Sequence, residues 1–433
     1  MKALRVGILV LITFSVLAHG VVEVWSESLL EVGAAALLAF WTVLLLQNPE
    51  CKIHWSPLNW PALGFLVIGL GQLIFHTTAY AFLTRVELLK MASYFIVFFL
   101  VMQAFRERAD LTQLAWFLLL LGFLVSLFGI MQAFTSSGEI YWFRKLTLGG
   151  DPFGPYVNRN HFAGFIELVA PVGLALVVFR GLRNDLFPLA ILLTIVPIGA
   201  LILSGSRGGI VGFAFEVGVL ALLAVRGKRK VGSGIGAISV VALAAAALIV
   251  WMGAGKAIER FSTLHPGDLT FGRRGSMFQG AARVFFDHPI AGSGVGTLVA
   301  VFPQFDSAYD GKVVDHVHDD YIETLAETGA IGGFCGLAFL WLLLRGALES
   351  FRAEQGHFSR ALHAGAITAL SGLLLHSFVD FNLHIPSNAL LFLVQAYIAT
   401  SPPLPSEAPA DVPGRRRRIS VLTKTESGSI GDI

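Results

Sequence analysis

Two histidines and several carboxylates crowd residues 315–329, a stretch that leads into an apolar segment. Imidazole exchanges a proton near neutral pH, so His318 could do acid–base or leaving-group work with a neighbouring carboxylate as base or orienter. We take His318, Asp319 and Asp320 as candidate catalytic residues. An acidic helix start would explain the carboxylates but not the paired histidines. The spacing is not diagnostic of a metal site, so we expect no metal ion.

A second group centres on Arg207, which lies in a turn of small residues between two apolar segments, 204–209. The glycines let a ligand approach the backbone, amides at a helix start favour negative charge, and a guanidinium binds phosphate oxygens bidentately. The turn therefore suits an anion. The alternative is a tight turn whose arginine only extends to the membrane surface.

A third group contains Arg273 and Arg274, two cations predicted on the outer side, just before residues 277–285. Apolar side chains recur there at helical spacing, which predicts a short amphipathic helix on the outer membrane surface. Such a helix could roof a site or simply pack on the bundle. The glycine string at 292–296 lacks a preceding strand and a lysine, so we interpret it as a connector rather than a nucleotide-binding loop.

Further polar residues lie at the ends of apolar segments. Ionisable groups at membrane depth are costly and usually face a cavity or a partner, so we take them as accessory site residues. They are Asn158, Arg159, Asn160, His161, His316, Asp380, Asn382 and His384.

The composition identifies the solvent of the chain as lipid. Of its 433 residues, 55% are hydrophobic and only 14% are charged, with a mean hydropathy of +0.71. A single water-soluble core cannot bury so much apolar surface. Windows long enough for a hydrocarbon layer of roughly 30 Å predict an all-α polytopic membrane protein of about twelve transmembrane helices. The windows are 4–20, 29–47, 62–80, 88–105, 113–135, 162–180, 186–204, 209–225, 234–254, 328–345, 361–378 and 386–400.

The charges orient these helices. With the N-terminus inside, most lysines and arginines of the short loops fall on the inner side, so both termini are predicted to be cytoplasmic. The basic run 226–230 is then a positive-inside anchor, and we expect no nucleic-acid partner. Residues 1–20 are an uncleaved first helix or a cleaved signal peptide.

We expect three regions. They are N-terminal transmembrane helices at 1–150, a membrane domain at 151–400 with a periplasmic loop of short helices at 255–327, and a disordered cytoplasmic tail at 401–433.

Taken together, these motifs resemble the O-antigen ligase and polymerase superfamily of bacterial surface-glycan enzymes. The resemblance covers roughly residues 150–400. It rests on the turn around Arg207, on Arg273-Arg274 ahead of Asp287-His288-Pro289, on His318-Asp319-Asp320-Tyr321 before Gly329, and on Asp380-Phe381-Asn382. The family's ligases usually have Asn, Ser or Gln after the histidine and Thr three residues past the glycine. This chain has Asp319 and Gly332 there.

The resemblance implies an inverting, metal-independent transferase of the bacterial inner membrane that needs no cofactor. Such an enzyme takes a glycan from undecaprenyl diphosphate at the periplasmic face and joins it to a hydroxyl of a saccharide or lipid A–core acceptor. A chain-length regulator is a possible partner. Arg207 and Arg274 match the family's diphosphate-binding arginines and His318 its loop histidine. Arg273, next to Arg274, is taken with them as a candidate diphosphate-binding residue. The alternative from another class is a transporter or flippase that moves an anionic lipid-linked substrate without chemistry, with polar residues near the membrane midplane.

Overall fold

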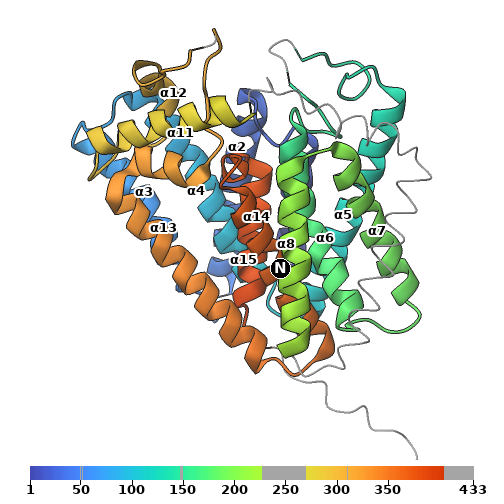
Figure 1. The fold of residues 1–433 in the computed structure, drawn as a ribbon. Helices are drawn as coiled ribbons and strands as arrows, with labels where there is room; N and C mark the ends of the chain where they lie inside the picture. The colour runs from blue at the N-terminus through green and yellow to red at the C-terminus, as the bar shows by residue number, and fades with distance from the viewer. Residues whose placement is uncertain (49, 51, 147–149, 227–269, 310, 404–433) are drawn as a thin grey trace, which may run out of the picture.

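The structure is a computed structural model that describes residues 1–433 apart from 49, 51, 147–149, 227–269, 310 and 404–433. Its described part is built of helices and loops, with isolated bridges but no strand (Figure 1). The all-α prediction is therefore confirmed. The predicted span at 234–254, the first part of the predicted loop and nearly all of the predicted tail lie outside the described residues.

The first half of the chain forms eight helices from the apolar segments that the sequence predicts. They are α1 (Lys2–Leu17), α2 (Val24–Gln47), α3 (Asn59–Ile74), α4 (Ala81–Ala104), α5 (Arg108–Thr135), α6 (Arg159–Val178), α7 (Phe187–Ser204) and α8 (Arg207–Arg226). The second half adds both long and very short helices. They are α11 (Thr270–Asp287), α12 (Leu298–Val301), η1 (Phe302–Gln304), α13 (Asp320–Ala353), α14 (His357–His376), η2 (Asn382–His384) and α15 (Pro386–Thr400).

Every predicted membrane segment within the described residues coincides with one of these helices, α1–α8 and α13–α15. Among the described residues, 8 helices are long and apolar enough to cross a membrane by themselves. They are α2, α4, α5, α6, α7, α8, α13 and α14. The shorter α1, α3 and α15 have 16, 16 and 15 residues. The chain is thus a polytopic membrane protein.

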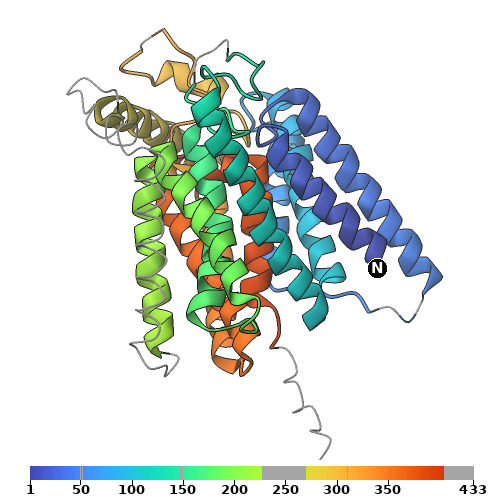
Figure 2. The same ribbon diagram turned by 90° about the vertical axis from the view of Figure 1, so that its right-hand side faces the viewer.

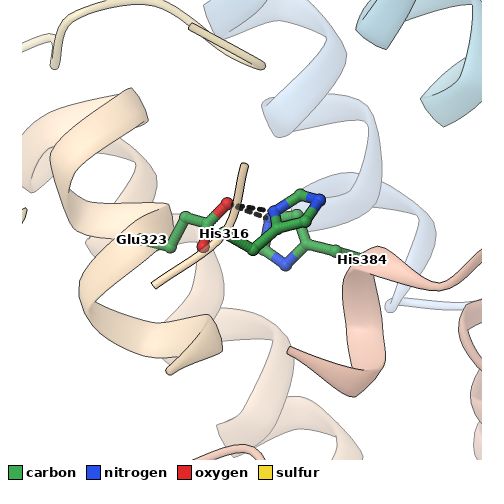
Figure 3. A group of neighbouring side chains, drawn as sticks. All are labelled: His316, Glu323 and His384. Carbon is green, nitrogen blue, oxygen red and sulfur yellow. Dashed lines mark hydrogen bonds and ion pairs between the residues drawn. The ribbon is translucent and has the colours of Figure 1, made fainter. Parts of the chain in front are cut away.

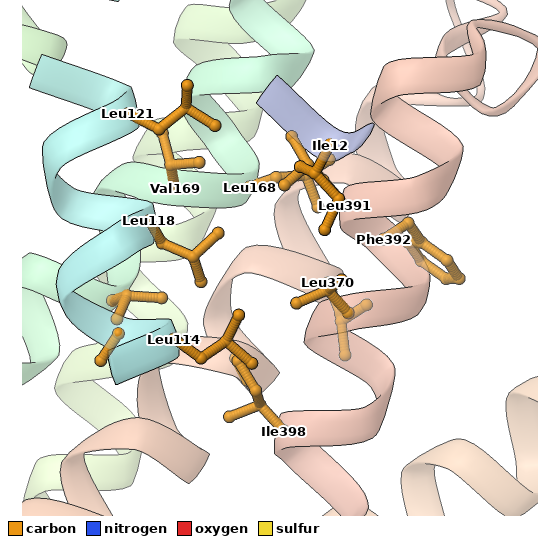
Figure 4. Packing of buried hydrophobic residues seen from close by; sticks show 14 of the residues in the cluster. Ile12, Leu114, Leu118, Leu121, Leu168, Val169, Leu370, Leu391, Phe392 and Ile398 are labelled. Atoms are coloured by element: carbon orange, nitrogen blue, oxygen red, sulfur yellow. The ribbon is translucent and has the colours of Figure 1, made fainter. Parts of the chain in front are cut away.

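Helix α6 is the centre of the bundle, because every residue from His161 to Val178 is buried. It packs against α14, α7, α5 and α8. Leu118 and Leu121 of α5 meet Leu168 and Val169 of α6 in a core to which α1, α14 and α15 also contribute (Figure 4). Helices α1 and α2 pack as a pair at one edge of the bundle (Figure 2).

One end of the bundle collects the polar elements. Helices α11 and α12 lie across this end, and the turn between α7 and α8 is at the same level (Figure 1). The opposite end holds the start of α1, where Arg5 pairs with Asp110 at the start of α5. The end of α15 is there too, since Tyr397 donates a hydrogen bond to the Phe105 carbonyl. The motif residues therefore share one end, as predicted, and the chain start lies at the other.

Helix α13 is bent where it meets the glycine-rich connector. Its 34 residues would extend about 51 Å, well beyond the hydrocarbon thickness. Gly329 interrupts the helix with φ 64° and ψ −163°. A Cβ there would lie 2.3 Å from the Ile290 carbonyl oxygen, so only glycine fits against the connector. The bend lets the first turns of α13 lie among the polar elements.

The predicted amphipathic helix at 277–285 is confirmed as part of α11. Its buried face, with Ala281 and Val284, packs on Phe302, Val317 and Ala326. The apolar face of α11 therefore packs against α13 and the neighbouring loops.

Candidate active site around Asp380

Asp380 is a fully buried carboxylate in the turn after α14, where four distant segments meet. Its Oδ2 accepts a hydrogen bond from Asn160 Nδ2 at 2.5 Å. Its Oδ1 lies 3.4 Å from His318 Nδ1 and 3.7 Å from His161 Nε2. Arg274 NH2 is 3.8 Å from Oδ2. A carboxylate, a guanidinium and two imidazoles thus form one contiguous charged group.

The surroundings keep Asp380 ionised. Burial alone would raise its pKa, but the close His318 and the charges of His161 and His376 hold the pKa well below its usual range. Asp380 can therefore stabilise positive charge on a histidine that takes up a proton.

Arg274 connects α11 with this turn. Its NH1 donates to the Val379 carbonyl at 2.7 Å, while its side chain remains partly exposed. The other donors of the guanidinium are available to an anion above Asp380. The structure therefore brings Arg274 and His318 together on Asp380, two of the residues that the sequence singled out.

Arg207 is the first residue of α8, and its exposed side chain forms no hydrogen bond or ion pair with the described residues. Its backbone neighbours nevertheless reach the same group. Ser206 Oγ donates to Asn160 Oδ1 at 2.8 Å, and Asn160 holds Asp380. A Cβ at Gly208 would lie 3.4 Å from Val379 Cγ2. The backbone at Arg207 thus lies next to the turn that Arg274 contacts.

Arg273, predicted to bind diphosphate with Arg274, points elsewhere. Its guanidinium forms a two-pronged pair with Asp306, at 2.5 and 2.7 Å, and its side chain is buried. The hydrogen bond from Arg273 lowers the pKa of Asp306. The geometry gives Arg273 a structural part, which is to hold α11 to the segment after η1.

The side chains of Asp319 and Asp320 are both engaged in other contacts, Asp319 at the start of α13 and Asp320 with η2. Asp319 caps the helix by accepting from Tyr321 N and Ile322 N at 3.0 and 3.1 Å. Asp320 accepts from His384 Nδ1 at 2.7 Å and from Leu383 N at 3.1 Å. The carboxylate beside His318 is therefore Asp380, which the sequence placed among the accessory residues.

His316, Glu323 and His384 form a second cluster close by (Figure 3). His316 Nδ1 lies 2.5 Å and His384 Nε2 3.5 Å from Glu323 Oε1. Burial would lower the pKa of His384, but Glu323 and Asp320 raise it to about 10. The donor atoms lie within 4.8 Å of one another, close enough to hold a metal ion. Through His384, which also contacts Asp320, the cluster ties the 315–318 loop to η2 and α13.

The remaining accessory residues mostly shape the backbone. Asn158 caps α6 by accepting from Asn160 N at 2.9 Å, and Arg159 pairs with Asp151 at 2.6 Å. Asn382 Oδ1 accepts from Asn388 Nδ2 at 3.2 Å. His161 differs, because it is buried and neither ring nitrogen has a hydrogen-bond partner in the described part.

The sequence reasoning missed a buried group deeper in the bundle. His376 Nδ1 of α14 lies 2.7 Å from Glu167 Oε2 of α6, and Glu216 of α8 is equally buried. Glycines leave space for these side chains between the helices, since a Cβ at Gly372 would be 2.1 Å from Glu216 Oε1. The sequence feature that could have revealed this group is a lone acidic residue inside each of two apolar spans, Glu167 and Glu216.

Fold and site define a polytopic membrane protein with a cationic, histidine-rich site at one end of its helices. Residues 189–337 match the family model of the O-antigen ligase. This match confirms the O-antigen ligase and polymerase superfamily that the motifs indicated. The matched range contains Arg207, Arg274 and His318 and ends before Asp380. No curated protein matches the chain in sequence.

Proposed function

We propose that this protein transfers a glycan from undecaprenyl diphosphate to a saccharide hydroxyl at the periplasmic face of the bacterial inner membrane. The reaction inverts the anomeric carbon and uses neither a metal nor a cofactor. Both termini face the cytoplasm. The observation that carries the proposal is the convergence of Arg274, His318 and His161 on the buried carboxylate of Asp380.

The leaving group is a diphosphate, so departing negative charge must be stabilised. Arg274 supplies guanidinium donors that Asp380 and Val379 hold in place. Arg207 adds a second cation from the start of α8. Donors fixed before the reaction stabilise developing charge without reorganisation, which is the largest single contribution in many enzymes. His318 adds a polar group on the same side.

The acceptor hydroxyl must lose a proton while its oxygen attacks the anomeric carbon. The new C–O bond forms as the bond to the diphosphate breaks, and the diphosphate departs with the electron pair. A histidine beside Asp380 takes the proton, because the carboxylate stabilises the imidazolium that forms. Attack opposite the leaving group inverts the configuration.

The family match supports both a ligase and a polymerase, and the acceptor separates them. A ligase joins the glycan to a lipid A–core acceptor, whereas a polymerase joins it to a second lipid-linked saccharide and works with a chain-length regulator. The membrane domain at 151–400 carries either reaction.

Reconstitution tests the proposal. Purified protein in liposomes receives undecaprenyl-diphosphate oligosaccharide with either acceptor, and products are separated by mass. We expect a product containing both saccharides and release of undecaprenyl diphosphate. Donor that stays intact with both acceptors would refute transferase activity.

A transporter or flippase is the second candidate, favoured by Glu167, His376 and Glu216 inside the helix bundle. Ionisable groups at this depth are frequent in ion-coupled transport. The same liposomes distinguish the two, because transport moves a fluorescent lipid-linked saccharide between leaflets and leaves its sugar–diphosphate bond unbroken.

A further inference from the structure

A cavity of about 510 Å³ opens beside Asp380 at the polar end of the bundle. Its walls come from the start of α2, from α4, from residues 144–146, 150, 157 and 158, from His161 of α6, from Asp315 and His316, and from the turn before α15. The volume falls within the range of about 300–1,000 Å³ typical of small-ligand sites. Arg274 and His318 are absent from its lining, which includes Phe381 and His161.

His161 connects this cavity to Asp380. It lines the cavity, only 3% of its surface is exposed, and its Nε2 lies 3.7 Å from Asp380 Oδ1. Neither ring nitrogen has a hydrogen-bond partner in the described structure. A buried polar atom without a partner is costly, so a ligand hydroxyl in the cavity would satisfy it. With Nε2 directed to Asp380, Nδ1 is the free acceptor.

The ring of Phe381 contacts both His161 and His318. Its ring centroid lies 4.7 Å from that of His161 and 4.9 Å from that of His318. His161 borders the cavity, whereas His318 belongs with Arg274. His161 and His318 approach the same oxygen of Asp380, Oδ1, at 3.7 and 3.4 Å, so a hydroxyl bound at His161 would lie close to the group that contains Arg274.

The lining favours a polyhydroxyl ligand rather than an anion. Its cations are compensated, because Lys90 pairs with Glu87 at 2.6 Å and Arg144 pairs with Glu23. Glu27 lines the same cavity, and its carboxylate forms no hydrogen bond or ion pair with the described residues. The Glu27 carboxylate interacts electrostatically with Lys90 but can still accept a hydrogen bond from a hydroxyl, and the Phe381 ring offers an apolar face to a sugar.

We propose that this cavity is the acceptor-saccharide subsite and that His161 is the base that receives the proton of the attacking hydroxyl. This inference rests on the proposed transferase function. The hydroxyl proton moves to Nδ1 of His161, the oxygen bonds to the anomeric carbon, and the diphosphate leaves with the electrons of the broken bond on the Arg274 side. The imidazolium returns the proton to water.

The test measures transfer at varied acceptor concentration with His161→Ala, Glu27→Gln and the control His288→Gln. His288 is exposed and lies away from the cavity. We expect His161→Ala to lower kcat roughly a hundredfold while binding of undecaprenyl diphosphate is unchanged. Added imidazole should restore part of the rate. Glu27→Gln should raise the acceptor KM severalfold with kcat nearly constant, and the control should match wild type.

Several results overturn the subsite. They are a His161→Ala rate within threefold of wild type, weakened donor binding with normal acceptor KM, or no response to imidazole. Should His161→Ala fail to fold by size-exclusion chromatography, Glu27→Gln decides, because an unchanged acceptor KM then refutes the assignment. Absence of transfer by the wild-type protein contradicts the transferase function itself, so the two failures are distinguishable.

Discussion

The guanidinium of Arg274 reaches from α11 to within 3.8 Å of the buried Asp380 carboxylate, while it donates to the neighbouring Val379 carbonyl. One residue of the helix that crosses the end of the bundle thereby reaches the turn between α14 and α15. The cation and the carboxylate that proposed catalysis requires are held by separate elements, so the site depends on the docking of α11.

Asp380→Asn tests the central carboxylate. The amide keeps an oxygen for the hydrogen bond from Asn160 but removes the charge that faces His161, His318 and Arg274. We expect glycan transfer to fall roughly a hundredfold or more, because no carboxylate then stabilises a protonated histidine. Product formation at equal protein level measures it. The control is Asp185→Asn, an exposed carboxylate just before α7 that lies away from the site. Transfer above a third of wild type would contradict a central role.

Much of the architecture could be predicted, because lipid imposes long apolar windows. Each predicted span in the described part is a helix, and helical spacing located α11. The partners of individual charges could not be predicted. Arg273 and Arg274 are adjacent, but consecutive residues of a helix point about 100° apart. Only one can therefore face Asp380, and the sequence does not give the rotation of α11.

The carboxylate that lies beside His318 could not be predicted for a similar reason. Asp319 and Asp320 follow His318 directly, yet Asp319 caps α13 and Asp320 accepts hydrogen bonds from η2. Asp380 lies far along the chain and reaches His318 only through the turn after α14. The partner of Glu167 became clear only from the packing of the helices, since nothing in the sequence indicates that Glu167 meets His376.

The Arg273–Asp306 pair should contribute to stability rather than to binding of the diphosphate. Arg273→Met leaves the Asp306 carboxylate, whose side chain is buried, without its partner. We expect a loss of roughly 3 kcal/mol in unfolding free energy. Arg273→Met with Asp306→Leu should recover most of it, because no charge then remains unpaired. Thermal unfolding in detergent measures both variants. A single variant as stable as wild type but unable to bind undecaprenyl diphosphate would instead make Arg273 a ligand residue.

The His384 cluster should make stability fall in alkaline solution. The pKa of His384 is raised from 6.5 to about 10 in the folded protein. A raised pKa contributes stability that is fully present below pH 6.5 and is lost as the pH rises toward 10. The unfolding temperature of wild type should therefore drop between pH 7 and pH 10. His384→Gln should start lower and show a shallower drop over the same interval. Parallel curves for the two proteins would rule out this contribution.

The predicted topology has its own test. Cysteine substitutions at exposed positions, Arg226→Cys at the end of α8 and Tyr309→Cys after η1, should be labelled from opposite sides of intact cells. A membrane-impermeant maleimide in the periplasm should modify position 309 only. The native Cys51 and Cys335 are first replaced by serine. Labelling of position 226 from outside would overturn the orientation that the loop charges predict.

Arg207→Lys distinguishes simple charge attraction from two-pronged recognition of a diphosphate. The substitution keeps the positive charge at the start of α8 but removes the planar fork of donors. If Arg207 grips the leaving group, loss of one fixed donor should slow transfer by roughly a hundredfold, a few kcal/mol in barrier height. Cells should then contain normal amounts of protein, accumulate lipid-linked oligosaccharide and lose long surface glycan.

The matched control for this change is Arg226→Lys at the other end of the same helix. That arginine is predicted to face the cytoplasm, where only its charge is needed, so the variant should make wild-type glycan. Equal protein levels by immunoblot allow the two strains to be compared. Wild-type glycan from the Arg207→Lys strain would exclude the diphosphate role, because an arginine that merely anchors α8 tolerates lysine. Loss of glycan in both strains would point to a general defect of α8 rather than to recognition of the diphosphate.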